Sequence, residues 1–288
     1  MSQLDGNAIS QIQDMTVASL SLEAIEKSLC PAIVLPNDFK VSSLENLQEG
    51  RFRFRGEMKT TSISDFVKYS IKNAIDEGVS CFIDADEMSA ETIFNLGTIG
   101  KAGHADNTAI VKLKQTAPFT ALLKMDGVKY RQKQLAEWLE DWHDYLMAFD
   151  ADGNVLDIKQ AISAVRRITI ESTRSAEHEN ADFSAKRSVL ENVEARSKDI
   201  MPATFQFTCT PYDELKERSI KLRYSVLTGD DIPVLVLRII QLEKLEEQIA
   251  QEFRDMLCNE FNESKIETFI GKFSAQLIAQ MPLTWWHL

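Results

Sequence analysis

The sequence predicts an α+β fold in which antiparallel sheets pack against amphipathic helices. Strand-like stretches come first, helical spacing dominates the middle, and further strand-like stretches and a helix close the chain. Because the two kinds of segment come in blocks and do not alternate one by one, their order favours an α+β arrangement over a doubly wound parallel sheet. With 288 residues, 44% of them hydrophobic, the chain can bury a sizeable core.

Phenylalanine and arginine alternate between Gly50 and Gly56, which predicts a short strand with its three arginines on one face: Arg51, Arg53 and Arg55. Such a row of guanidinium groups can bind phosphates or the acidic residues of a neighbouring subunit. The formal net charge of -12, from 44 acidic and 32 basic residues, works against broad binding of nucleic acid. We therefore expect pairing within or between subunits, and keep contact with DNA as an alternative.

Helical and strand-like patterns follow from Ser64 onward. A helix is expected to begin after Ser64 as its N-cap and to end at Gly78 as its C-cap. Strands are expected at 81–85 and 108–113, while 89–97 fits either a strand or a helical turn.

The strongest helical pattern runs from Gln132 to Phe149 and carries an apolar stripe that includes Trp138 and Trp142. Such a stripe is typical of a helix packed on the core, so we expect both tryptophans to be structural. The TAPF sequence at 116–119 is interpreted as the break before this helix. Asp157 is expected to cap a further helix.

The last third of the body returns to a period of two. Antiparallel strands are expected at 204–209, 220–227 and 233–240, with a turn at 228–231 between the last two. Apolar residues at helical spacing then predict an amphipathic helix over 245–261.

These patterns suggest three parts. Residues 1–30 form an N-terminal arm or peripheral helix, 31–273 form one α+β domain, and 274–288 form an apolar C-terminal tail. The domain is either undivided or consists of two lobes that meet near 150–200. Within that region the polar stretch 172–199 fits a mobile loop or an exposed helix.

No secretory signal is visible at the N-terminus, and the most apolar stretch, Ile232 to Ile240, is too short to span a bilayer. The four cysteines lie far apart without a CxxC pair: Cys30, Cys81, Cys209 and Cys258. We expect reduced thiols, no cofactor and a soluble protein of the cytoplasm that does not bind a membrane.

Two clusters of polar residues are weak candidates for catalysis. The DADG sequence that contains Asp150 and Asp152 is similar to the start of haloacid-dehalogenase-type phosphatases, in which two aspartates share a magnesium ion. That chemistry requires the end of a buried strand, whereas a helix is expected here, so a tight turn explains the residues more simply. His104 and Asp106 form the second cluster, as a base or metal ligands, and a structural role in the loop is the alternative.

Several segments together resemble the YfdQ-like family of phage and prophage proteins: GHADNTAIVKLKQTAPFTALL, QLAEWLEDW, ARSKDIMPATFQFTCTPYDEL, LVLRI, EEQIAQEFRDML and FIGKF. The resemblance spans roughly residues 30–273 and implies an accessory role during phage infection of a bacterial host. It supplies no catalytic residues.

The leading hypothesis is a phage or prophage protein that acts without catalysis, by forming a homo-oligomer or by binding a host or phage macromolecule. Trp285 and Trp286 in the tail are typical anchors at interfaces. One alternative is a metal-dependent hydrolase that uses Asp150 and Asp152 or a site around His104. Another is a recombination or counter-defence factor that contacts DNA through the three arginines.

Overall fold

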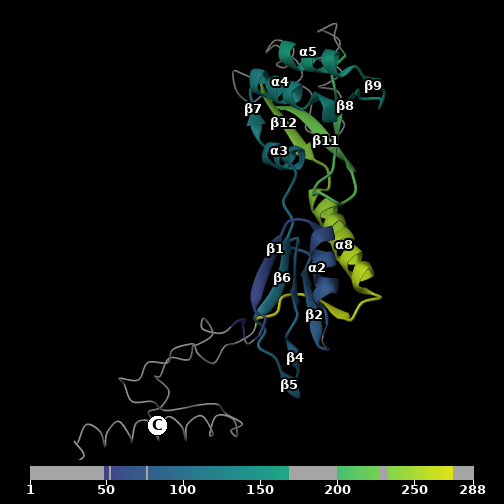
Figure 1. Ribbon diagram of the computed structural model, residues 1–288. Coiled ribbons are helices and arrows are strands. Elements are labelled where there is room, and N and C mark those ends of the chain that lie inside the picture. Colours follow the sequence, from purple (N-terminus) through teal and green to yellow (C-terminus); the bar gives the residue numbers. More distant parts are fainter. Residues whose placement is uncertain (1–48, 52, 76, 169–199, 228–232, 275–288) are drawn as a thin grey trace, which may run out of the picture. The chain divides into compact units, whose positions relative to one another are not determined.

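The computed structural model describes residues 49–51, 53–75, 77–168, 200–227 and 233–274. The chain divides into two units, Met1–Phe54 and Arg55–Leu288. In the first unit only residues 49–51, 53 and 54 are described, and these are irregular. The second unit contains two larger sheets, each with its own helices (Figure 1).

The first of these sheets has five strands in the order β1-β6-β3-β2-β13. The two outer pairs, β1 with β6 and β13 with β2, are parallel, whereas β3 runs antiparallel to both of its neighbours. The strands are β1 (Gly56–Thr60), β2 (Val79–Asp84), β3 (Ser89–Ile93), β6 (Asn107–Lys112) and β13 (Ile266–Ile270).

Helices α2 (Ile63–Asn73) and α8 (Leu242–Phe261) lie side by side against one face of this sheet (Figure 1). Phe66 of α2 meets Phe261 of α8 edge to face at 6.0 Å between ring centroids. The hydroxyl of Ser70 in α2 donates a hydrogen bond of 3.1 Å to Thr92 of β3. The residues of the three central strands on this face, Cys81, Thr92 and Ala109, are fully buried, so the middle of this face belongs to the core.

The second sheet has six strands in the order β7-β12-β11-β10-β8-β9, with antiparallel pairing throughout. Its strands are β7 (Lys129–Tyr130), β8 (Leu146–Phe149), β9 (Val155–Leu156), β10 (Thr204–Cys209), β11 (Arg218–Leu227) and β12 (Val234–Ile239). The same stretch of chain supplies α3 (Ala117–Met125), α4 (Gln132–Asp141), the 3₁₀ turn η2 (His143–Tyr145) and α5 (Ile158–Arg167). A small hairpin of β4 (Gly97–Thr98) and β5 (Lys101–Ala102) completes the described elements.

The predicted α+β class is confirmed, and so are most of the long elements. Strands β2, β6, β10, β11 and β12 and helix α8 lie where the patterns placed them. The side chain of Asp157 accepts a hydrogen bond of 3.1 Å from the backbone N–H of Gln160, which makes it the N-cap of α5 as predicted. The ambiguous stretch 89–97 contains strand β3.

Several local predictions are wrong, among them the break expected at 116–119, where helix α3 begins. The Phe-Arg alternation does not form a strand in its described residues, because β1 begins only at Gly56, and Phe54 is 65% exposed. The N-cap of α2 is Ser62 and not Ser64, and its C-cap is Ala74. The long helix expected up to Phe149 ends at Asp141, and its last residues form β8, which pairs with β10.

Several predictions fall outside the described residues: the arm at 1–30, the polar stretch 172–199, the turn at 228–231 and the tail from 275 onward. The division into arm, body and tail therefore stays a prediction. Within the ranges that the structure describes, no helix is both long and apolar enough to cross a membrane.

Candidate binding surface on the five-stranded sheet

One row of residues crosses the face of the five-stranded sheet that is opposite α2 and α8. Pairing in register aligns one residue from each strand: Lys59, Ile110, Glu91, Phe82 and Phe269. Successive side chains of a strand point to opposite faces, so this row lies opposite the buried row that contains Cys81. All five side chains are half-buried or exposed. This face therefore offers side chains that are available for contact.

Three phenylalanines form an aromatic cluster at one end of that row: Phe82, Phe269 and Phe273. The ring of Phe82 stacks on Phe269 at 5.5 Å and on Phe273 at 5.0 Å between centroids. Phe269 is 45% exposed and Phe273 is 38% exposed. Large apolar side chains gathered in one exposed place mark contact surfaces more often than scattered ones do.

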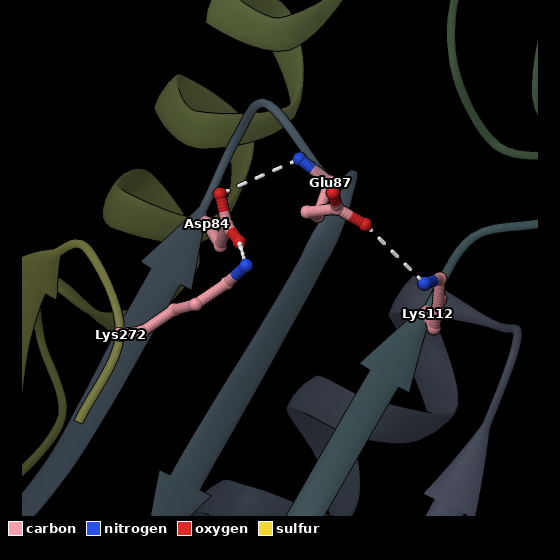
Figure 2. A network of polar contacts seen from close by, with 4 residues as sticks. All are labelled: Asp84, Glu87, Lys112 and Lys272. Atoms are coloured by element: carbon pink, nitrogen blue, oxygen red, sulfur yellow. Dashed lines mark hydrogen bonds and ion pairs between the residues drawn. The ribbon is translucent and has the colours of Figure 1, made fainter. Parts of the chain in front are cut away.

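A chain of charged side chains lies beside the aromatic cluster, where β2, β3 and β6 meet (Figure 2). The ammonium of Lys272 is 2.7 Å from Oδ2 of Asp84, and that of Lys112 is 3.4 Å from Oε2 of Glu87. The backbone N–H of Glu87 donates to Oδ1 of Asp84 at 3.4 Å. The Lys272 ammonium holds the pKa of Asp84 below its usual value, and Asp84 in turn raises the pKa of Lys272.

A hollow of about 210 Å³ lies between the aromatic cluster and this ion pair, and Glu91 is one of its lining residues. Burial, and then the charge of Glu57, raise the pKa of Glu91. The hollow therefore combines aromatic rings, an ion pair and a carboxylate that binds its proton more tightly than usual. Aromatic side chains beside polar and charged groups are typical of protein–protein interfaces, which have an apolar core and a polar rim.

The outer edge of the same surface is strand β13. Within the described chain it is the last strand of its sheet and pairs only with β2. Ile270 at its end is 61% exposed, next to the exposed Phe269. An edge strand with unpaired backbone groups and exposed apolar side chains is a ready site for pairing with another chain. The sequence patterns do not predict β13, although its last two residues begin the FIGKF segment that carries part of the family resemblance.

The structure gives Asp106 a structural role and leaves His104 on the surface. Asn95 donates a hydrogen bond of 2.9 Å from its side-chain amide to Asp106, and its side-chain oxygen accepts from the backbone N–H of Asp106 at 3.2 Å. These bonds close the loop that precedes β6. His104 is exposed in that loop.

Asp150 and Asp152 lie in the tight turn between β8 and β9. The motif follows strand β8 and not the helix that the sequence predicts here, so that prediction is wrong. The turn is nonetheless observed: Oδ1 of Asp150 accepts from the backbone N–H groups of Asp152 at 2.9 Å and Asn154 at 2.8 Å. Asn154 also donates from its side chain to Oδ2 at 2.9 Å. The carboxylate of Asp150 is thus engaged on both oxygens.

Among the residues that the structure describes, no three histidine, cysteine, aspartate or glutamate side chains gather in a way that could hold a metal ion. Arg51 is exposed while Arg53 and Arg55 are half-buried, and each of the three already has an interaction partner. Trp285 and Trp286 lie outside the described residues. The roles in binding of the three arginines and the two tryptophans stay predictions.

Trp138 and Trp142 pack on the second sheet. Their rings lie 6.0 Å and 6.4 Å from that of Phe207 in β10, and both are partly buried against the core. This arrangement fits the structural role that the sequence predicted for them.

The fold and this surface define an α+β protein with an exposed aromatic sheet edge. The chain belongs to a family described as an uncharacterized conserved protein (DUF2303), whose family model matches residues 6–273. No curated protein and no solved structure matches the chain.

Proposed function

We propose that the protein acts without catalysis, by self-association through the exposed edge of its five-stranded sheet. The observation that supports this most is the exposure of apolar side chains at β13 and just after it: Phe269 and Phe273 on one face of the sheet and Ile270 on the other. Leaving such side chains in water costs free energy, at about 25 cal/mol for each Å² of apolar surface. Burying them against a partner recovers part of that cost.

The biological setting that we propose is an accessory role during phage infection, in the cytoplasm of a bacterial host. Its support is the resemblance of the segments quoted above to YfdQ-like phage and prophage proteins. Binding of a host or phage protein at the same surface is compatible with this role. The acidic chain, with a net charge of -12, supports protein partners over nucleic acid.

Sedimentation equilibrium of the full chain at micromolar concentrations tests self-association. We expect a mass above that of one chain, and a shift toward one chain when Phe273 is replaced by Ser. The matched control is Ile99→Ser, because Ile99 is fully exposed and lies at the β4–β5 hairpin, away from the edge. A strictly single-chain mass for the wild type would overturn the proposal.

A further inference from the structure

We propose that the partner at this edge is a second copy of the chain, and that two β13 strands pair antiparallel about a two-fold axis at Phe269. Two five-stranded sheets would then form one continuous sheet across the dimer. The inference rests on the proposed self-association and adds its geometry. Two-fold dimers place the same patch of both copies against each other, so the patch must be complementary to itself.

The backbone of β13 is prepared for such a pairing on its outer side. The N–H of Gly271 donates to the carbonyl of Ile83 in β2 at 2.8 Å, so the odd-numbered residues direct their backbone groups inward. The even-numbered Thr268 and Ile270 consequently direct theirs away from the sheet. The N–H of Ile266 is already bonded to the hydroxyl of Ser264 at 3.1 Å, so pairing centres on the two residues that follow.

The register follows from these two residues. Opposing Thr268 with the partner's Ile270 lets them exchange both backbone hydrogen bonds, as outward residues of antiparallel strands do. Phe269 then faces the partner's Phe269 at a position without backbone bonds, where side chains are closest. Aromatic pairs across strands are favourable at such positions. The stacked Phe82 of each copy extends this contact into an aromatic band.

Charges permit this register although the chain as a whole is acidic. The segment 265–272 carries two lysines and one glutamate, against 32 basic and 44 acidic residues in the whole chain. In the proposed register Glu267 lies opposite the partner's Gly271, beside the partner's Lys272. Directly opposed like charges, which destabilise a strand pair, are therefore avoided at the centre.

The opposite edge of the sheet is less suited to pairing. Strand β1 carries Glu57 and Lys59, which are paired with each other. Charged side chains on an edge strand are a common protection against pairing with another chain. In β13 three of the five residues are instead apolar: Ile266, Phe269 and Ile270.

The size of this contact sets its expected strength. The surface that a strand of five residues and its neighbouring rings can bury is smaller than the roughly 800 Å² per partner of a standard interface. We therefore expect a reversible dimer that dissociates in the micromolar range. Added salt should strengthen it, because two chains of net charge -12 repel each other.

Disulfide trapping tests the geometry in the full chain, with Cys30 and Cys258 replaced by serine. Phe269→Cys should form a linked dimer under mild oxidation, whereas Ile99→Cys at the β4–β5 hairpin should not. Thr268→Cys and Ile270→Cys should each form little linked dimer alone. A mixture of the two proteins should form much more, because Thr268 lies opposite the partner's Ile270 in the proposed register. Circular dichroism of each variant establishes that it is folded before it is oxidised.

A second variant measures the same edge without a crosslink. Ile270→Lys changes an exposed side chain, so folding should persist, while the dimer dissociation constant should rise at least about tenfold. If the wild type associates but Phe269→Cys does not link and Ile270→Lys does not weaken it, the β13 geometry is overturned and self-association stands. A wild type that is a single chain at all concentrations overturns both.

Discussion

The carboxylate of Glu214 accepts a hydrogen bond of 2.9 Å from the backbone N–H of Ile63, 151 positions earlier in the chain. Its other oxygen accepts from the N–H of Ser64, also at 2.9 Å. The hydroxyl of Ser62 accepts from the N–H of Asp65 at 3.2 Å. The first N–H groups of a helix have no acceptor within it, and here three of them are satisfied by two side chains. The connection between β10 and β11 thereby holds the start of α2.

Replacing Glu214 with Gln should lower the free energy of unfolding at neutral pH by about 1 kcal/mol, the usual value of a helix cap. Burial alone would raise the pKa of Glu214, but the hydrogen bonds from Ser64, Ser62 and Ile63 lower it overall from 4.5. Because the pKa is lower in the folded protein, the ionised carboxylate stabilises the fold at pH values above the pKa of the unfolded chain. This contribution is lost as the pH falls through the pKa of the folded protein. Urea unfolding across pH should show the difference from wild type shrinking below pH 4.5. Glu217→Gln, at an exposed neighbour, is the control.

Glu91→Gln should stabilise the fold at neutral pH by about 0.5 kcal/mol, a value typical of partly exposed charge pairs. Burial and the charge of Glu57 raise the pKa of Glu91, so its ionised form is unfavourable in the folded state. Because the pKa is higher in the folded protein, the protonated carboxyl contributes stability at pH values below the pKa of the unfolded chain. That contribution is lost as the pH rises through the pKa of the folded protein. Thermal melts should therefore show the gain at pH 7 and none at pH 3. Equal gains at both values would contradict the electrostatic cause.

Tyr224→Phe should leave the stability unchanged or increase it by up to about 1 kcal/mol. The hydroxyl of Tyr224 is buried in the second sheet without a hydrogen-bond partner among the described residues. Removing it eliminates a desolvated polar group and keeps the ring, which meets Phe205 edge to face at 6.1 Å. Chemical denaturation measures the change, with Tyr212→Phe as the control at a half-buried tyrosine. A loss above 1 kcal/mol would show that the hydroxyl is hydrogen-bonded in solution.

Local patterns were sufficient for elements whose own sequence decides their structure. Buried residues alternate with half-buried ones in β10 and mainly with exposed ones in β11, and α8 buries Ile249, Phe253 and Leu257 on one stripe. Asp157 caps α5 through a bond that spans only three residues. In each case the determining contacts are close in the sequence or follow a single period.

Strand pairing between residues far apart in the sequence explains elements that local patterns do not predict. Residues 146–149 continue the helical stripe, yet Leu146 pairs with Phe207 and the segment becomes β8. Helix α3 is not predicted by local patterns, because Pro118 favours a break there. In the structure Thr116 caps the helix, and proline is tolerated in the first turn of a helix. The binding surface required the register of five strands, which no single segment contains.

The buried thiols of Cys81 and Cys209 should resist alkylation in the folded protein. Burial raises the pKa of Cys81 to about 12 and that of Cys209 to about 11. Alkylating reagents attack the thiolate, so a neutral buried thiol reacts slowly. A short iodoacetamide pulse at pH 8, followed by peptide mass spectrometry, should label the half-buried Cys258 ahead of both. Equal labelling in urea is the control, and fast native labelling of Cys81 would contradict its burial.

Asp150→Asn should loosen the turn between β8 and β9. Hydrogen bonds from the side chain of Asn154, and then from the backbone of Asn154 and Asp152, hold the pKa of Asp150 below its usual value. An asparagine keeps one acceptor oxygen but turns its own N–H donors toward one of these groups. Hydrogen exchange of the turn amides should therefore become faster, with little change in the sheets.

The same variant distinguishes a structural role of Asp150 in the turn from the alternative role of Asp150 in a hydrolase site. A structural Asp150 predicts equal magnesium affinity in wild type and variant by titration calorimetry, together with the faster exchange. Asp213→Asn, at an exposed residue of another turn, is the control for a general loss of charge. Magnesium binding that is present in the wild type, kept in the control and lost in Asp150→Asn would instead establish Asp150 as a metal ligand, because carboxylate oxygens are the groups that magnesium prefers.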